Sequence, residues 1–207
     1  MATKHGGPFG AQAHAIGILT LVQNNYDNEF LHEIKFVIGA HFNASGSDPG
    51  AWNFSSIGNL LGSFGSWANG GGFGTTAYNV ATLWTSRSYG GVIGLAWVNA
   101  LCGGNRYNIC VDFSGNSNSL RNLQAHELGH NFGLTHDGSG SPHIMAPAVN
   151  GSNTWSSQSV SQMNGNIPFS CMGGCIGVSP PIADFTATPT LGCAPMVVQF
   201  TDLSSNN

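Results

Sequence analysis

Charged residues are scarce in this sequence of 207 residues. Asp, Glu, Lys and Arg together make up 7% of it, far below the roughly 25% of an average protein. With five Lys and Arg residues and a net charge of −4, the chain has no basic stripe to hold phosphates, so we do not expect nucleic acid as a partner. It also lacks an apolar run of membrane-spanning length, and its hydrophobic fraction of 41% indicates a globular protein.

The start of the chain lacks the apolar stretch of a secretory signal, since its first nine residues read MATKHGGPF. Export is nevertheless indicated by five cysteines, at positions 102, 110, 171, 175 and 193, among many small polar residues. Buried free thiols of a cytosolic protein are the alternative. The odd number leaves at least one cysteine unpaired within this chain. We expect a secreted protein with disulfides, whose signal peptide and prosegment are missing from this sequence.

Apolar spacing predicts helices and strands that alternate along most of the chain. Two early helices and a helix that starts near Ser117 are separated by four strand patterns. The helices are predicted over Ala11 to Asn25, Ser55 to Ala68 and Leu120 to Phe132, and the strands within Leu31 to Phe42, Tyr78 to Thr85, Val92 to Leu101 and Tyr107 to Phe113. This order is typical of an α/β domain with a mixed sheet.

The composition changes near the end, at Gly173-Gly174 and again at Ser179-Pro180-Pro181. The tail has no helical period but contains two short alternating runs, Ala183 to Ala187 and Met196 to Thr201. Two strands of that length cannot bury a core alone, so we interpret the tail as the beginning of a β-sandwich. The predicted organisation is a first domain over 1–176, a linker over 177–181 and a partial β-sandwich domain over 182–207.

The stretch HELGHNFGLTHD holds three of the eight histidines and one of the three glutamates. If it begins on a helix, His126 and His130 project from one face, one turn apart, and can hold a single ion. Gly133 can take a positive φ, which lets the chain leave the helix sharply and bring His136 back as a third ligand. Glu127 is too near in sequence to share the ion comfortably but is well placed to touch a water bound to it.

Three neutral imidazoles leave a zinc ion one open position, where a water has its pKa lowered to about 7. Glu127 would then take the proton during attack on a peptide carbonyl and deliver it to the departing amine. A purely structural zinc site is the main alternative. Such sites usually have four protein ligands and are rich in cysteine, and no cysteine lies near the cluster. The sequence therefore predicts a catalytic zinc site.

The pattern HExxHxxGxxH followed by a methionine resembles the metzincin metallopeptidases. Met145, nine residues after His136, matches their methionine turn, in which the methionine packs beneath the ligands without binding the ion. Asp137, directly after the third histidine, resembles the adamalysin or reprolysin branch, which includes the ADAM and ADAMTS proteases. The resemblance covers about Gly10 to Cys175. It implies a twisted, mixed and mostly parallel sheet with a long active-site helix.

Two further stretches agree with that branch. The segment around GGVIGLAWVNALC resembles its edge strand, along which a peptide substrate lies, and this implies Gly94, Leu95 and Ala96 as substrate-binding residues. An ordinary strand is the alternative there. The stretch TWSSQSVSQMNGNIPFSCM resembles the closing helix and final cysteine of the family.

The resemblance also implies a disulfide pairing. By that match Cys171 pairs with Cys102, which leaves Cys110 and Cys175 as a second bridge. Four cysteines allow three pairings, so the connectivity stays open at this point.

The sequence departs from the family at its start. Members begin with a central β-strand, which residues 1–9, with Gly6, Gly7 and Pro8, cannot supply, so we predict that this strand is missing. The tail is similar to the first third of a PKD domain through ADFTATPT and GCAPMVVQFTD. Calcium is common in relatives, but no acidic loop assigns a calcium site.

The function predicted from these observations is that of a secreted zinc endopeptidase acting on protein or peptide substrates. Its zinc ligands would be His126, His130 and His136, with Glu127 as general base and acid and Met145 as the floor of the site. The alternatives are an amidase or peptidase of narrow specificity, and a catalytically silent, zinc-stabilised adhesion module. The other histidines have no matching partner in the sequence and are predicted to be structural or exposed: His5, His14, His32, His41 and His143.

Overall fold

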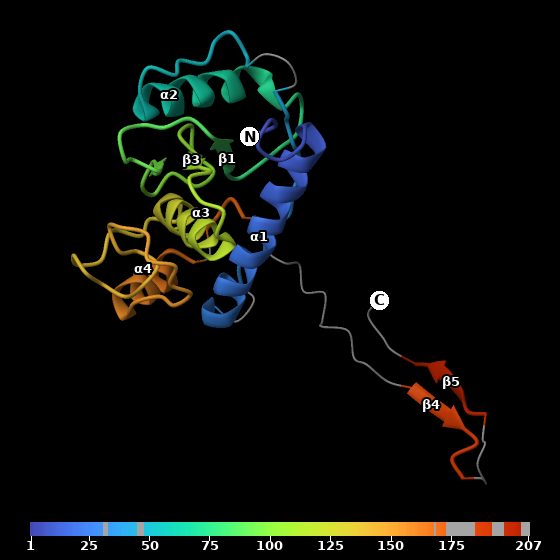
Figure 1. Cartoon of the computed structure of the whole chain (residues 1–207). Coiled ribbons are helices and arrows are strands. Elements are labelled where there is room, and N and C mark those ends of the chain that lie inside the picture. Colours follow the sequence, from blue (N-terminus) through green and yellow to red (C-terminus); the bar gives the residue numbers. More distant parts are fainter. Residues whose placement is uncertain (31–32, 45–47, 168, 173–184, 192–196, 204–207) are drawn as a thin grey trace. The chain divides into compact units, whose positions relative to one another are not determined.

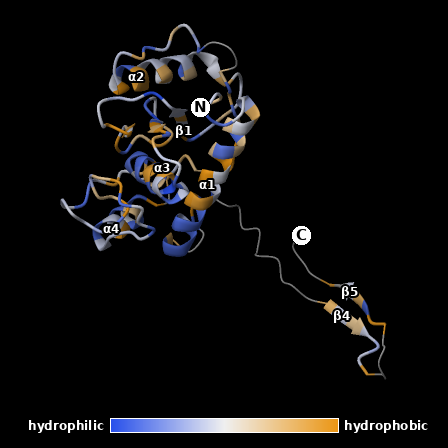
Figure 2. Ribbon diagram, viewed as in Figure 1, coloured by the Kyte–Doolittle hydropathy of each residue, from blue (hydrophilic) through white to orange (hydrophobic). Residues whose placement is uncertain are grey.

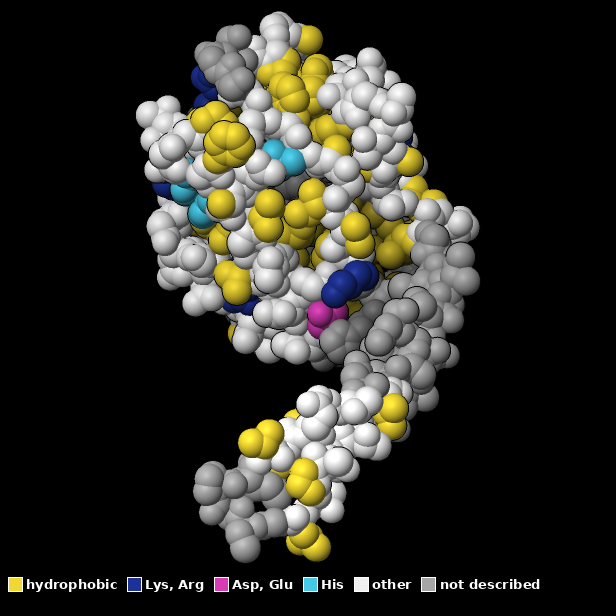
Figure 3. Space-filling view, turned by 90° about the vertical axis from the view of Figure 1, so that its right-hand side faces the viewer, with side chains coloured by type: hydrophobic (Ala, Val, Ile, Leu, Met, Phe, Trp, Pro, Cys, Tyr) yellow, Lys and Arg dark blue, Asp and Glu magenta, His cyan; other side chains and the backbone are white. Residues whose placement is uncertain are grey.

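The computed structural model describes residues 1–30, 33–44, 48–167, 169–172, 185–191 and 197–203 (Figure 1). The chain divides into two compact units, Met1–Cys171 and Met172–Asn207. No helix within the described ranges combines the length and the apolar character needed to cross a membrane. Figure 3 shows how few charged side chains reach one face of the molecule, where hydrophobic side chains lie between uncharged polar ones.

The first unit is a mixed α/β structure, as predicted, with helices on both faces of a small sheet. The sheet has the order β1-β3-β2, with a parallel β1–β3 pair and an antiparallel β2–β3 pair rather than a parallel majority. Helices α2 and α3 lie on opposite sides of it and α1 crosses beside α3 (Figure 1). The elements are α1 (Pro8–Phe30), α2 (Ile57–Trp67), a π-helical turn (Ala68–Gly72), β1 (Ala81–Thr85), β2 (Gly94–Ala96), β3 (Tyr107–Val111), α3 (Ser117–Asn131) and α4 (Ser157–Asn166).

Strand β3 is buried on both faces because it lies between the two helical layers. Side chains alternate along a strand, so Tyr107, Ile109 and Val111 share one face, where they pack against α2. Asn108 and Cys110 share the other face, and the amide of Asn108 donates to Asn131 Oδ1 of α3 at 2.7 Å. One face of β3 therefore packs in an apolar core, and its other face contacts the polar helix α3.

Helix α2 forms for local reasons that its sequence shows. The hydroxyl of Ser56 caps it by accepting from the backbone N–H of Asn59 at 3.0 Å. Leu60, Leu61 and Phe64 fall at helical spacing and are buried against the sheet. The predicted helix over Ser55 to Ala68 is confirmed.

Helix α3 is buried over most of its length although it carries many hydrophilic residues (Figure 2). Buried polar groups cost free energy unless they are hydrogen-bonded, and several of these have specific partners. Arg121 donates to Asn25 Oδ1 of α1 at 2.9 Å, and Asn131 donates to the carbonyl of Trp97 at 3.0 Å. Because α3 is polar and yet lies in the centre of the domain, we infer that its side chains have a role besides packing.

An aromatic cluster joins α1 to α3 on the side away from α2. Tyr26 lies edge-on to Phe36 and Trp155, each with ring centroids 5.0 Å apart. Its hydroxyl donates to the carbonyl of Ala125 in α3 at 3.1 Å, and burial raises the pKa of Tyr26 well above its ordinary value. Phe132 completes the cluster at the end of α3.

The strand predicted within Leu31 to Phe42 is wrong for the residues that the structure describes, which run from residue 33 and form no regular element. The alternation is partly kept, because Ile34 is buried and its neighbours are exposed. The backbone, however, is bonded to a side chain: Gln23 donates to the carbonyl of Ile34 and accepts from the N–H of Phe36. No described strand lies alongside this segment, so apolar alternation alone did not produce a ladder.

Other expectations differ from the structure mainly in length. The first helix extends well beyond Ala11 to Asn25 and begins at Pro8, whose fixed φ suits a first helical position. Only three residues of the predicted strand over Val92 to Leu101 form β2, and a turn with a positive φ at Asn99 follows. Residues 1–9 form turns and the start of α1, not a strand.

The disulfide between Cys102 and Cys171 is confirmed, with a Cα–Cα distance of 6.2 Å. It joins the turn after β2 to the segment after α4, across 69 residues of sequence. The predicted second bridge between Cys110 and Cys175 is wrong, because Cys110 is a free thiol buried in β3. Cys175 lies outside the described residues.

The second unit contains two short strands, β4 (Phe185–Thr188) and β5 (Gln199–Asp202), which pair antiparallel. They overlap the two alternating runs predicted in the tail. Phe185 and Phe200 lie diagonally across the pair, with ring centroids 5.7 Å apart, and both remain exposed. The assignment of this unit to a PKD-like β-sandwich remains a prediction.

Two glycines of α2 offer a test of the packing between α2 and β3. A methyl group at Gly62 would meet nothing within 4 Å, whereas one at Gly65 would lie 2.9 Å from the buried Tyr107 ring. We expect Gly62→Ala to raise the free energy of unfolding by about 0.5 to 1 kcal/mol, because alanine is the better helix former. Gly65→Ala should lower it by about 1 to 3 kcal/mol through overpacking.

Urea unfolding of both variants, followed by circular dichroism, makes this comparison, and each variant is the matched control for the other. Equal effects of the two substitutions would show that α2 does not pack on Tyr107 as described.

Candidate active site

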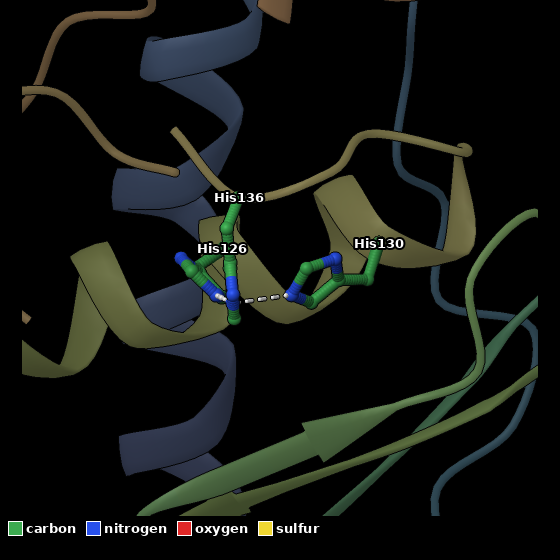
Figure 4. A group of neighbouring side chains, drawn as sticks. All are labelled: His126, His130 and His136. Carbon is green, nitrogen blue, oxygen red and sulfur yellow. Dashed lines mark hydrogen bonds between the residues drawn. The ribbon is translucent and has the colours of Figure 1, made fainter. Parts of the chain in front are cut away.

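Three histidine side chains converge beside α3, as Figure 4 shows. His126 and His130 lie one turn apart on α3, and His136 returns from the loop that follows it. The Nε2 atom of His136 is 3.1 Å from the Nε2 atoms of both His126 and His130. His126 and His130 are buried, whereas His136 is exposed. The predicted three-histidine group is therefore assembled, with one side open to solvent.

Backbone carbonyls fix which nitrogen of two rings faces the centre. His126 Nδ1 lies 2.8 Å from the carbonyl of Ile144, and His130 Nδ1 lies 2.8 Å from the carbonyl of Leu134. A carbonyl only accepts, so each Nδ1 carries the proton and each Nε2 is left with a lone pair. Burial lowers the pKa of His126 to about 4, against the raising effect of its bond to Ile144, and burial also lowers the pKa of His130.

The donor set fits a zinc ion. Two of the Nε2 atoms carry lone pairs, and His136 has a single Nε2 proton to offer to either of them, so one contact at 3.1 Å stays repulsive in the neutral cluster. A cation between the rings removes that repulsion. Tetrahedral zinc with Zn–N bonds of about 2.0 to 2.1 Å requires donor atoms about 3.3 Å apart, which is close to the separations observed.

The sharp exit from α3 depends on Gly133. Its φ is +94°, and the N–H of Leu134 bonds to the carbonyl of Gly129 while the N–H of Gly133 bonds to that of His130, both at 2.9 Å. This pair of bonds is the Schellman ending of a helix, which favours glycine at the left-handed position. A side chain there would also collide with Asn166 Nδ2 at 2.6 Å. Sequence reasoning therefore identified the correct residue for this turn.

Met145 lies directly beneath the ligand-bearing turn of α3. It is fully buried, and a methyl group at Gly129 would come within 2.8 Å of its sulfur. The residue before it, Ile144, accepts the bond from His126. The turn that carries Met145 thus packs on α3 and orients the first histidine.

Asp137 connects the third histidine to the segments that follow. Its backbone N–H bonds to the carbonyl of Met145 at 2.9 Å. Its carboxylate accepts from the hydroxyls of Ser156 at 2.6 Å and Ser141 at 3.2 Å. Because Ser156 also caps α4, the buried Asp137 fixes the loop on which His136 lies.

Glu127 is buried between α3 and strand β2. A methyl group at Gly94 would overlap Glu127 Oε1, so the glycine leaves the room that the carboxylate occupies. Glu127 Oε2 has no hydrogen-bond partner among the described residues, and burial raises the pKa of the carboxyl to about 8. The structure therefore brings the predicted Glu127 and Gly94 into contact beside the histidines.

Some polar residues of the site were missed by sequence reasoning. Asn131 donates to the carbonyl of Trp97, which directly follows β2, and to that of Tyr107 in β3, and so joins α3 to both segments. Apart from this site, His5 and His14, which were predicted to be structural or exposed, lie together beside Asp112. Their partners are far away in the sequence, so no local spacing could have revealed them.

Comparisons with known proteins agree with this geometry. The family profile described as "Metallo-peptidase family M12", of reprolysin type, matches residues 1–170. The chain belongs to this family. A similar protein is "Snake venom metalloproteinase atroxlysin-1" from Bothrops atrox, which is 37% identical over 79 residues, or 37% of this chain and 39% of the venom protein.

A second relative is "A disintegrin and metalloproteinase with thrombospondin motifs 18" from Mus musculus. It is 37% identical over 74 residues, which are 31% of this chain and 6% of the mouse protein. The chain thus spans well under half the length of these relatives. Among solved structures, a chain of "Structure of a chaperone-substrate complex" matches with a TM-score of 0.54 and 19% identity, over 77% of this chain and 30% of that one, which shows the fold alone.

The raised pKa of Glu127 predicts how the stability of the metal-free M12 chain depends on pH. Between its ordinary value of 4.5 and about 8, the unfolded chain loses the proton that the folded chain keeps. Stability is therefore lost as the pH rises. At pH 6.5, the ordinary pKa of histidine, half of the unfolded chains still carry a proton on each of His126 and His130, so their lowered pKa values offset part of this loss until about pH 7.5. We expect the free energy of unfolding to fall by about 1 kcal/mol from pH 6.5 to 8.

Urea unfolding in the presence of a chelator, at several pH values, measures this dependence. The control is Glu127→Gln, which keeps the shape of the side chain but cannot ionise and should lack the decrease. An equal decrease in both chains would show that Glu127 is not its cause.

Proposed function

We propose that this chain is the catalytic part of a secreted zinc endopeptidase. The observation that carries the proposal is the convergence of three imidazole nitrogens beside a buried carboxylate, Glu127, at the edge of a sheet. A metal held only for stability needs no unpaired carboxylate beside it. Membership of the M12 peptidases and the Cys102–Cys171 disulfide support the proposal and its extracellular location.

The ligands in this proposal are His126, His130 and His136. A bound zinc ion would act as a Lewis acid, which polarises the peptide carbonyl and lowers the pKa of a water molecule bound to the ion. Glu127 accepts the proton of the attacking water and delivers it to the departing amine. No tyrosine follows Met145 in the sequence, so the chain supplies no phenol to the oxyanion from that side.

The other residues position these groups. Met145 forms the floor under the ligand-bearing turn, Gly133 allows the sharp return of the chain, and Asp137 holds the loop of His136 through two serine hydroxyls. These contacts support the roles proposed for them, Met145 as the methionine turn and Gly133 and Asp137 as structural residues.

Strand β2 is the proposed substrate-binding edge. Ile93 accepts from Val111 at 2.7 Å and Trp97 donates to Tyr107 at 3.4 Å, so these two residues have backbone groups directed at β3. Backbone directions alternate in an antiparallel pair, which turns the N–H and C=O groups of Gly94 and Ala96 outward. A peptide in extended form would bond to them as an added strand, while Leu95 packs on the α2 core.

The general-base role is tested with Glu127→Gln. We expect the rate of cleavage of casein or a quenched fluorescent peptide to fall by about 10²- to 10⁴-fold, because a positioned proton acceptor is lost. The zinc content, measured by elemental analysis, should stay the same. A chain that binds zinc, folds and cleaves no peptide even with Glu127 intact would favour the silent adhesion module instead.

The substrate edge is tested with Ala96→Pro, which removes one outward N–H from an edge strand. Loss of one hydrogen bond should lower kcat/KM by about 3- to 10-fold. Thermal unfolding and zinc content serve as controls for the fold. Unchanged kcat/KM in a well-folded variant would show that substrate does not pair with β2.

A further inference from the structure

A second group of metal-binding side chains lies at the end of β3, apart from the three-histidine site. His5 precedes α1, His14 lies within α1, and Asp112 directly follows β3. Their donor atoms all lie within 4.8 Å of one another. His5 Nε2 is 2.7 Å from Asp112 Oδ2, and His14 Nε2 is 3.8 Å from Asp112 Oδ1.

We propose that His5, His14 and Asp112 form a second binding site, for a divalent transition metal ion such as Zn²⁺. Two imidazoles and a carboxylate are a donor set that zinc accepts. Donor atoms on tetrahedral zinc lie about 3.3 Å apart, between the two separations to Asp112 observed here. Small side-chain rotations would therefore bring both imidazoles to bonding distance. The proposal does not depend on peptidase activity.

Asp112 is held in a fixed position at the end of β3. Its carboxylate is fully buried, and its backbone N–H bonds to the carbonyl of Thr85 in β1 at 2.7 Å. A buried carboxylate requires a cationic or hydrogen-bonding partner. Asp112 meets this requirement with Lys4 and His5 in the metal-free chain, and a metal ion would meet it as well.

Only one of the two imidazoles is hydrogen-bonded to Asp112. Their rings are stacked, with centroids 3.9 Å apart and planes inclined by 19°. The bond from His5 to Asp112 accounts for His5, but His14 Nε2 is buried without a hydrogen-bond partner among the described residues. A metal ion bound to Asp112 would give this atom the partner that it lacks.

Lys4 occupies the place of the cation in the metal-free chain. Its ammonium group lies 2.8 Å from Asp112 Oδ1 and 2.9 Å from the carbonyl of Asp112. The Lys4 side chain is 39% exposed, so it can withdraw into solvent when a metal ion binds. Competition with Lys4 makes this site weaker than the three-histidine site. A bound ion would join the segment before α1, α1 itself and the end of β3.

Zinc stoichiometry of the 207-residue chain tests the proposal, measured by equilibrium dialysis and elemental analysis. We expect two zinc ions per chain in the wild type and one in His14→Ala. His126→Ala should lose the other ion and keep the one at Asp112. The matched control is His41→Ala, because His41 is exposed and bonds only to Asn43 among the described residues; this variant should keep both ions.

The variant Lys4→Met tests the second site without removing any of its metal ligands. Without the competing ammonium group, zinc should bind the second site about tenfold more tightly. Zinc should also raise the midpoint of thermal unfolding of a His126→Ala chain, and His14→Ala should abolish that increase. One zinc ion per wild-type chain, or a second ion that persists in His14→Ala, would overturn the proposal.

Discussion

The structure around α3 depends on bringing three imidazole nitrogens close together, an arrangement that neutral rings resist. Two carbonyls hold the proton of each α3 histidine on Nδ1, which directs the lone pair of Nε2 to a common centre. Those carbonyls belong to Ile144 and Leu134, in segments that leave the helix and return to it. The folding of the loop after Gly133 and of the turn at Met145 is therefore part of the metal site itself. A cation at the centre stabilises the loop as well as the rings.

The same constraint explains why a polar helix is buried in the middle of the domain. The protein around the centre of α3 keeps solvent away from the carboxyl of Glu127. Burial of this carboxyl costs free energy in the metal-free chain, as its raised pKa indicates. Packing on both sides offsets it. The α2 core covers one face of β3, and the aromatic cluster around Tyr26 joins α1 to the other side of α3.

Features set by neighbours in sequence could be predicted, and features set by distant partners could not. The spacing of His126, His130 and Gly133 acts within one or two helical turns, and its geometry agrees with expectation. The segment after Leu31 alternates like a strand, but a strand also needs a partner, and its backbone bonds to Gln23 instead. Asp112 lies 107 residues from His5, so its cluster appears only after folding. The pairing of Cys102 with Cys171 came from family resemblance, because spacing alone left three choices.

The two edges of the sheet are not equivalent, and Gly94 makes the difference. The outer edge of β1 lies on the far side of β3 from Glu127, whereas β2 places Gly94 against the carboxylate itself. Any larger residue at that position would push Glu127 away or move the strand. The glycine therefore does two things at once: it leaves space for the proposed base, and it lets an extended backbone approach that base along the edge. A peptide paired with β1 would lie on the far side of β3 from Glu127, so the proposed chemistry belongs to one edge of the sheet.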